Sequence, residues 1–302
     1  MLDVRKLNAL REIALRGSFS AAAEELHYSQ SAISQQVAQL ERQVGTLLIE
    51  RGGRGIRLTS AGRALVDHTN LILRHMTEAE AELEAITGQR QSALRLVTFG
   101  SAAATFMPPA IRRFRAEHPG TVVTMGMAES VAAMSLVANG EADIAVISRY
   151  GSAVAADGIV VTDLLDDPMR VALPLEHRLA ERAEVSLADL SEESWVLATT
   201  SGCADWEVFA DACRVAGFEP RIAVRNDDYL AVQGFVAAGL GVALLPSLVA
   251  VAAMARRDIA VRPLGVNAPV RRIGAAVFAG AARSPSITAM LEALRGSASE
   301  CG

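Results

Sequence analysis

Residues 18–51 read SFSAAAEELHYSQSAISQQVAQLERQVGTLLIER, and this stretch decides the fold of the N-terminal part of the chain. Its pattern predicts two short helices, the first capped by Ser20 and the second running from about residue 30 to 43. The polar residues 27–29 form the turn between them. Apolar residues of the second helix lie four, three and four positions apart, so they form one stripe. They are Ile33, Val37, Leu40 and Val44.

The opposite face of the second helix carries short polar side chains, where a solvated face usually carries Glu and Lys. Hydroxyl and amide groups donate and accept hydrogen bonds, as base edges in a major groove require. The pattern favours a helix-turn-helix whose second helix reads DNA; the alternative is an ordinary αα-hairpin with a glutamine-rich exposed face. The residues expected to contact DNA here are Ser29, Gln30, Ser31, Ser34, Gln35, Gln39 and Arg42.

Residues 50–62 read ERGGRGIRLTSAG, in which arginines alternate with glycines and then with apolar residues. The glycines suit a tight turn between two strands, and guanidinium groups suit contacts to the sugar-phosphate backbone. The segment therefore predicts a β-hairpin wing, followed by a helix that Thr59 or Ser60 caps. The wing residues expected to contact DNA are Arg51, Arg54 and Arg57.

Residues 1–62 resemble the winged helix-turn-helix of LysR-type transcriptional regulators. The resemblance rests on SFSAAAEELHYSQSAIS, on the QLE at 39–41, on the LIER at 48–51 and on RGIRLTSAG in the wing. Ser31 stands where proline is frequent in the family, and Gln35 where arginine is frequent. The resemblance implies a DNA-binding domain over residues 1–59 and double-stranded promoter DNA as its partner, without a particular base preference.

Positive charge is concentrated at the N-terminal end. Residues 1–60 contain eight Lys or Arg and six Asp or Glu, a net charge of +2, whereas the whole chain carries −5. A basic end suits DNA phosphates. So small a charge predicts weak binding by a monomer, and affinity must then come from several copies acting together.

The next segment, residues 60–90, predicts a long helix. Its apolar and small residues alternate four and three positions apart over three heptads, the pattern of a two-stranded coiled coil. The alternative is an amphipathic helix packed on its own domain. In the family that the chain resembles, this linker helix pairs two winged domains, and effector domains join dimers into tetramers. The predicted seam consists of Leu65, Thr69, Ile72, Met76, Ala79, Leu83 and Ile86.

Beyond a polar hinge at 88–92, short apolar strands alternate with helices to the end of the chain. This order predicts parallel sheets covered by helices, an α/β domain over residues 91–302. The phrases FRAEHPG, NGEADIAV and AAGLGVALLP resemble the effector domain of the same family. That resemblance implies a periplasmic-binding-protein-like fold of two lobes, the first from about 91–163 and 268–302, the second from about 164–267.

Hydroxyl-bearing residues follow several predicted strands, at points where helices begin. Parallel sheets bind small molecules at these strand ends, and hydroxyls beside helix N-termini suit a carboxylate or other small anion. Arg149 is a candidate counter-charge. The alternative is that these residues only cap helices. A small-molecule effector is expected to contact Ser101, Ala102, Ser130, Ser148, Arg149, Thr199, Thr200, Ser201 and Asp227.

The three cysteines do not form a disulfide framework. Cys203 and Cys213 are ten residues apart, about where peroxide-sensing members of the resembling family carry their reactive pair. A thiol-based redox-sensing regulator is therefore an alternative. No basic residue or His adjoins Cys203 to lower its pKa, and the apolar helical pattern around Cys213 is typical of a core position.

Enzymatic and transport functions find little support. The five His are scattered without metal-ligand spacing, and the chain has neither a phosphate-binding glycine loop nor a nucleophile elbow. A solute-binding protein without a regulatory role would need an export signal, and the N-terminus has no apolar leader. We therefore expect a cytoplasmic, effector-responsive regulator that forms homodimers or homotetramers, is not an enzyme, and has no metal, cofactor or membrane partner.

Overall fold

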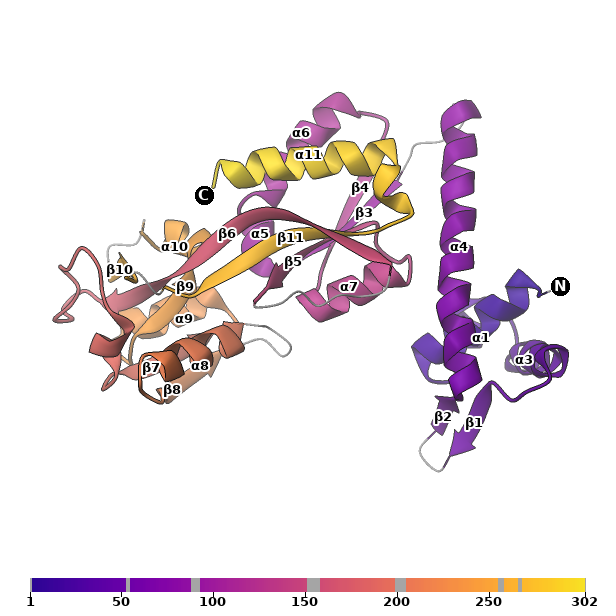
Figure 1. Cartoon of the computed structure of the whole chain (residues 1–302), viewed down its shortest axis with the longest axis horizontal. Coiled ribbons are helices and arrows are strands. Elements are labelled where there is room, and N and C mark those ends of the chain that lie inside the picture. Colours follow the sequence, from indigo (N-terminus) through magenta and orange to yellow (C-terminus); the bar gives the residue numbers. More distant parts are fainter. Residues whose placement is uncertain are drawn as a thin grey trace. The chain divides into compact units, whose positions relative to one another are not determined.

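The computed structural model of the chain describes residues 2–52, 55–87, 93–150, 158–198, 205–254, 258–265 and 268–301. The chain divides into two compact units, one up to residue 90 and one from residue 91 onward (Figure 1).

The first unit is a winged helix-turn-helix. The hydroxyl of Ser18 accepts a hydrogen bond from the Ala21 N–H and caps α2, so the prediction of Ser20 as the cap is wrong. The turn into α3 passes through His27, whose φ of 55° lies in the left-handed region. The elements of this unit are α1 (Val4–Arg16), α2 (Phe19–Glu25), α3 (Gln30–Val44), β1 (Ile49–Gly52), β2 (Gly55–Leu58) and α4 (Ser60–Thr87).

The predicted apolar stripe of α3 is confirmed. Ile33, Val37 and Leu40 are buried. They pack with Leu10 and Ile13 of α1, a helix that the sequence pattern left unassigned. The wing is confirmed as well, since β1 and β2 pair antiparallel. The wing therefore shares one small core with α1, α2 and α3, to which α4 also contributes.

The first half of α4 packs on its own domain. Val66 belongs to the winged core, and Leu65 and Ile72 pack against that core. Thr69 is fully buried, and its hydroxyl donates to the Leu65 carbonyl at 2.7 Å. The alternative of self-packing is therefore correct for these seam positions, because α1 covers them.

The second half of α4 has a different environment. Met76 is 44% exposed, and Ala79 is exposed too. The side chains of Leu83 and Ile86 lie outside what the structure describes. The part of the predicted seam that can meet a second copy therefore begins at Met76.

The second unit is built on a mixed sheet with the strand order β10-β6-β11-β5-β3-β4, in which β9 also pairs with β6. β3 is parallel to β4 and β5, as predicted, but β11 is antiparallel to β5 and β6. The prediction of parallel sheets is wrong here, because strands that leave and re-enter a lobe run in opposite directions. The strands of this sheet are β3 (Ala93–Thr98), β4 (Val122–Met127), β5 (Ile144–Arg149), β6 (Ile159–Pro174), β9 (Ala243–Pro246), β10 (Ile259–Pro263) and β11 (Val270–Phe278).

β6 and β11 connect the two lobes of the second unit (Figure 1). Up to Pro168, β6 pairs with β11; from Met169 onward it pairs with β9 and β10. Each lobe has its own core, one around Phe106 and Phe114 and the other around Trp195. The ladder between β6 and β11 is thus the covalent and hydrogen-bonded bridge between two separately packed bodies.

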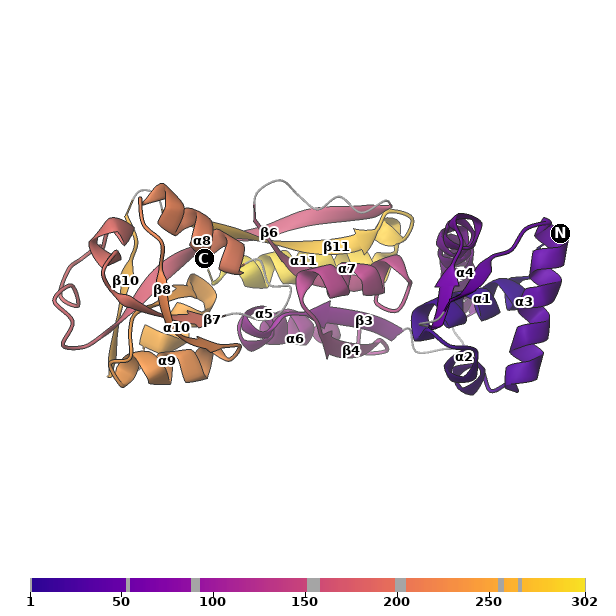
Figure 2. The same cartoon turned by 90° about the horizontal axis from the view of Figure 1, so that it is seen from below.

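Helices cover the sheets on both sides, and Figure 2 shows α8, α9 and α10 gathered around the strands of the second lobe. That lobe also contains the parallel pair β7 (Ser194–Ala198) and β8 (Arg221–Asn226). The helices are α5 (Gly100–Ala104), α6 (Met107–Glu117), α7 (Ser130–Ala138), α8 (Asp205–Val215), α9 (Tyr229–Ala237), α10 (Ser247–Met254) and α11 (Pro285–Ser299).

Candidate functional site

The predicted DNA-reading surface of the first unit is the outward face of α3. Ser31, Gln35 and Arg42 are exposed there, while Ser34 and Gln39 are half-buried. Helical geometry places them opposite the buried stripe, so the polar groups point away from the core. This face matches the prediction of a helix side rich in donors and acceptors.

Residues at the start of α3 have additional roles. The hydroxyl of Ser29 caps the helix by accepting from the Ala32 N–H at 3.2 Å, and it lies 3.0 Å from the Ser31 hydroxyl. The amide oxygen of Gln30 accepts from Ser20 at 3.2 Å. Ser20 therefore contacts the first residue of α3 rather than capping α2.

The wing is tied to α3 through Glu41. Its carboxylate accepts from the backbone N–H groups of Leu48 and Ile49, at 2.8 and 3.2 Å. Of the wing arginines, Arg57 is exposed. Arg54 and the side chain of Arg51 lie outside the described residues.

The junction between wing and linker helix depends on Gly62. Thr59 caps α4 by accepting from the Gly62 N–H at 3.0 Å, and its hydroxyl donates to the Leu47 carbonyl at 2.8 Å. A Cβ at Gly62 would lie 2.1 Å from the Leu48 carbonyl oxygen. Close backbone packing therefore requires glycine in the TSAG segment.

In the second unit, the predicted effector residues lie at the C-terminal ends of β3 and β5 and at the start of α7. Ser101 is buried, and its hydroxyl accepts from Arg271 Nη2 at 2.6 Å. The Ser130 hydroxyl accepts from the Ser148 N–H at 2.9 Å. The Ser148 hydroxyl is buried without a hydrogen-bond partner among the described groups, and Ala102 lies fully inside the core.

Sequence reasoning missed the charged pair beside Ser101. Arg271 Nε lies 2.8 Å from Asp167 Oδ2, and the two side chains are 3% and 1% exposed. The Arg271 guanidinium also lies 5.2 Å from the centre of the Phe99 ring. Asp167 Oδ1 accepts from the Leu248 N–H at 3.1 Å, at the start of α10. This pair therefore contacts groups that belong to both lobes.

Arg149, the predicted counter-charge, forms an ion pair with Asp163 of β6. To reach Asp163, the Arg149 side chain crosses β11 above Gly274. A Cβ added at Gly274 would lie 3.4 Å from Arg149 Nη2. Alternation along β5 places Arg149 on the sheet face opposite Ser148. The arginine that contacts one of the predicted hydroxyls, that of Ser101, is therefore Arg271.

The second lobe contributes less of the predicted site. Asp227 is exposed, and the α9 cap is Asp228, which accepts from the Leu230 N–H at 2.8 Å. The predicted contacts on the segment after β7 lie outside the described residues, as does Cys203. These contacts are Thr199, Thr200 and Ser201.

The second cysteine of the predicted redox pair, Cys213, is buried and has a raised thiol pKa. Cys213 is fully buried in α8, and this burial raises the pKa of its thiol to about 12. A neutral thiol is a poor nucleophile. The structure therefore agrees with the expectation of a core position.

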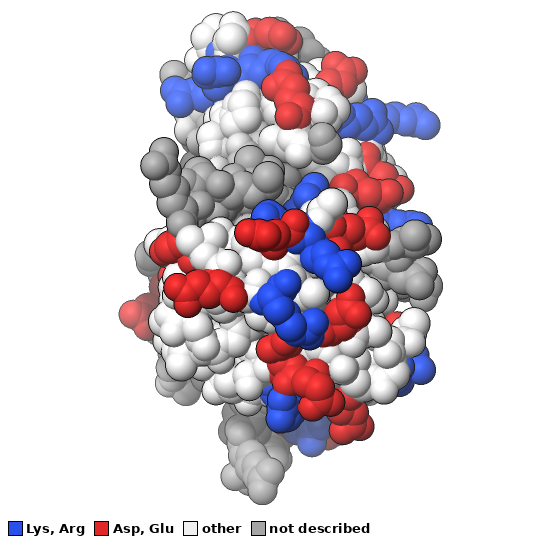
Figure 3. Space-filling view, turned by 90° about the vertical axis from the view of Figure 1, so that its left-hand side faces the viewer, with Lys and Arg blue, Asp and Glu red and all other residues white. Residues whose placement is uncertain are grey.

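Charged side chains are interspersed on the face of the second lobe that Figure 3 shows. The described residues of this face do not present the continuous basic stripe that DNA backbone contacts need. Among the described residues there is also no group of three His, Cys, Asp or Glu placed to hold a metal ion. Nor does any helix in the described ranges have the length and apolar character to cross a membrane.

Family models cover almost the whole chain. The model of the bacterial regulatory helix-turn-helix protein, lysR family, matches residues 4–63, and the LysR substrate binding domain matches residues 87–299. The chain belongs to the LysR family. The winged unit and the two-lobed unit are therefore the DNA-binding and effector-binding domains of a LysR-type transcriptional regulator.

Curated relatives of this LysR-family chain are transcriptional regulators. The transcriptional dual regulator GltC of Bacillus subtilis is 30% identical over 245 residues, which cover 81% of this chain and 81% of GltC. The regulator AlsR of the same organism is 28% identical, over 82% of this chain and 81% of AlsR.

Solved structures share the fold of the whole chain. A full-length OxyR variant from Pseudomonas aeruginosa has a TM-score of 0.75 at 22% identity and covers 98% of this chain and 95% of OxyR. The LysR-family regulator CbnR has a TM-score of 0.62 at 23% identity, covering 98% and 99% of the two chains. CbnR has also been solved with its target DNA, with a TM-score of 0.57 at 24% identity, covering 98% of this chain and 100% of CbnR.

Proposed function

We propose that this protein is an effector-responsive transcriptional regulator that reads operator DNA with α3 and grips the flanking backbone with its wing. The observation that carries the proposal is the exposed face of α3, where Ser31 and Gln35 offer groups that pair with base edges. Family membership supplies the DNA-binding and effector-binding domains. The protein then acts where the DNA is, in the cytoplasm.

Selection of bound sequences from a random-sequence DNA duplex library tests whether α3 recognises particular base pairs. Gln35→Ala should remove preference at particular base pairs, at a cost of about 1–3 kcal/mol, while Arg57→Ala should weaken binding to all sequences alike. A Gln35→Ala protein that enriches the same sequence as the wild type would remove Gln35 from the readers.

The effector is proposed to be a small molecule bound between the two lobes, with an anion as the favoured chemistry. Support comes from the hydroxyls of Ser101, Ser130 and Ser148, which cluster at neighbouring strand ends of the first lobe. The opposing contacts would come from residues 199–201 and Asp227. Redox sensing receives less support, because the raised pKa of Cys213 leaves Cys203 without a reactive thiol partner.

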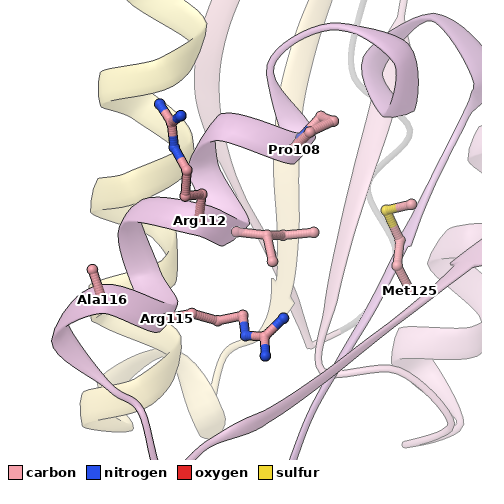
Figure 4. A pocket seen from close by; sticks show the side chains of 6 residues that line it. Pro108, Arg112, Arg115, Ala116 and Met125 are labelled. Atoms are coloured by element: carbon pink, nitrogen blue, oxygen red, sulfur yellow. The ribbon is translucent and has the colours of Figure 1, made fainter.

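Assembly is proposed to use two surfaces, the exposed half of α4 for dimers and the effector domain for tetramers. A groove of about 660 Å³ lies between α6 and the edge strand β4 (Figure 4). Arg112 and Arg115 line it from α6, and Met125 lines it from β4, where Val122 and Met127 are also exposed. Exposed apolar side chains on an edge strand are typical of a surface that another protein chain covers.

A second copy is the proposed partner because the second lobe presents the acidic side chain of Glu184, whereas Asp211 in the same groove is already paired with Arg214 at 2.5 Å. Glu184 and Asp211 line a groove of about 450 Å³ there, together with apolar Val215. Met125→Asp with Met127→Asp should convert tetramers into dimers in sedimentation experiments. Val131→Asp, at an exposed apolar position of α7, is the matched control and should leave tetramers intact. A wild-type protein that sediments only as a dimer would contradict the tetramer.

A further inference from the structure

The geometry points to Arg271 as a positioning residue of the effector site. Held by Asp167, it fixes the Ser101 hydroxyl as a hydrogen-bond donor, so that an effector must place an acceptor oxygen at Ser101. This inference rests on the proposed effector site and adds the residue that orients it and the chemistry that it selects.

The position of Arg271 is fixed from two sides. Its Nε contacts Asp167 at 2.8 Å, and its guanidinium carbon lies over the Phe99 ring, 5.2 Å from the ring centre. Nη2 then reaches Ser101 Oγ at 2.6 Å. A planar guanidinium with two of its edges held has little freedom to turn, so the donor that faces Ser101 is preorganised.

The hydrogen bond from Arg271 determines which further hydrogen bonds the Ser101 hydroxyl can form. A serine hydroxyl has one proton and two lone pairs, and an arginine can only donate. Ser101 Oγ must therefore accept from Arg271, and its own proton needs an acceptor elsewhere. None of the described groups is seen to accept it. The cation at 2.6 Å also polarises the O–H bond, which makes this hydroxyl a stronger donor.

A second hydroxyl, that of Ser130, also accepts a hydrogen bond and has its proton left to donate. The Ser130 hydroxyl accepts from the Ser148 N–H, so its proton is also available for donation. The hydroxyl of Ser148 itself is buried without a hydrogen-bond partner among the described groups. The hydroxyls near these adjacent strand ends can therefore each donate a hydrogen bond. A carboxylate can accept several such bonds, because it has two oxygens and about four lone-pair sites.

Arg271 does not serve as the effector's counter-charge. Asp167 is in direct contact with it and is equally buried, so the pair as a whole is neutral. Its influence on an effector therefore passes through the Ser101 hydroxyl. The selectivity follows from hydrogen-bond direction: an acceptor takes the Ser101 proton, whereas a donor would have to use the remaining lone pair beside the Arg271 guanidinium, so ligands that offer only donors are disfavoured.

The test uses the full-length protein and measures binding of acetate, benzoate, succinate and glutamate at millimolar concentrations by calorimetry. Benzylamine, similar to benzoate in size but offering only donors, is the opposite probe. The tightest carboxylate for the wild type is carried through the variants. Ser101→Ala leaves the charged pair in place and should weaken that carboxylate about tenfold or more, without affecting benzylamine.

The decisive variant is Arg271→Met with Asp167→Leu, which removes both charges together and avoids an orphaned one. It should lose carboxylate affinity about as much as Ser101→Ala, and adding Ser101→Ala to it should cost little more, because both changes remove the same oriented donor. The matched control is Arg272→Met with Asp166→Leu, the exposed pair next along the same strands. It should bind the carboxylate like the wild type.

Melting temperature and DNA binding are measured for every variant, so that a folding defect is recognised. Full carboxylate affinity in a folded Arg271→Met, Asp167→Leu protein would overturn the inference. So would an unchanged affinity in Ser101→Ala, which tests the hydroxyl even where the pair variant is unfolded. A wild type that binds DNA but none of the four carboxylates would also overturn it while leaving the regulator itself intact; loss of DNA binding in the wild type would instead contradict the proposed function.

Discussion

Arg271 and Asp167 stand directly opposite each other in the antiparallel ladder of β11 and β6, with Nε and Oδ2 2.8 Å apart. Because both side chains are buried, substituting one of them should cost more stability than substituting both. Removing one partner leaves an uncompensated charge in the interior, whereas replacing both by apolar side chains removes the desolvation cost of the pair as well.

Arg271→Met alone should therefore lower the free energy of unfolding of the effector domain by about 3–5 kcal/mol, and Asp167→Leu in the same chain should restore most of it. Urea unfolding followed by tryptophan fluorescence reports this domain, because both tryptophans, Trp195 and Trp206, lie in it. A double variant no more stable than Arg271→Met would show that the ion pair itself is required for the fold.

Gly62→Ala should destabilise the winged domain. The added Cβ would lie 2.1 Å from the Leu48 carbonyl oxygen, so that α4 must move away from β1. Overpacking of this kind costs about 1–3 kcal/mol, and DNA affinity should fall because the wing moves with β1. Thermal melting of Gly62→Ala against Ser60→Ala, an exposed neighbour, measures the effect; equal melting temperatures would contradict the close contact.

Met76→Asp with Leu83→Asp should dissociate the dimer without unfolding the winged domain. Met76 is exposed in the single chain, and a methionine buried in a dimer contributes about 1.5–3 kcal/mol per copy. Ile72→Asp is a poor choice for this purpose, because Ile72 packs against the winged core and its loss should lower the melting temperature. Sedimentation decides the assembly, and circular dichroism checks folding. A dimer that survives both charges would place the interface elsewhere.

Cys213 should resist alkylation in the native protein. Its pKa is raised to about 12 by burial, so at pH 8 roughly one molecule in ten thousand carries the reactive thiolate. The same shift stabilises the fold below the ordinary thiol pKa, and that contribution is lost as the pH rises from there toward 12. Iodoacetamide labelling read by peptide mass spectrometry should modify Cys213 only after unfolding in urea. Rapid labelling of the folded protein would show that the helix around it opens.

Much of the fold was predictable where a local signal marks both ends of an element. α7 ends where Asn139 and Gly140 interrupt an apolar run, and β11 is a mostly apolar run that begins after Pro269. β6 was missed because its sequence, IVVTDLLDDPMRVALP, mixes acidic residues with apolar ones and contains a proline. Its partners on both edges make it a strand, and pairing of distant segments leaves no local pattern.

The site was predictable in part for the same reason. Hydroxyls at strand ends can be identified from residue type and position, and Ser101 and Ser130 lie at strand ends as expected. Arg271 and Arg272 are indistinguishable in the sequence, yet the first is buried and the second is exposed. Register against β6 decides this, since it sets Arg271 opposite Asp167 on the core face of the sheet.

The packing of α4 has a mechanical consequence. Arg11 of α1 donates to Asn70 of α4 at 2.8 Å, and the buried Thr69 lies beside that contact, so the first turns of this 28-residue helix are fused to the body that carries the reading helix. At 1.5 Å per residue the helix is a rod about 42 Å long. We expect a tilt imposed on its far end to turn α3 with it, because the described contacts join both helices to α1. In a dimer paired through the far half of α4, we therefore expect the angle of this helix to set the spacing between the two copies of α3.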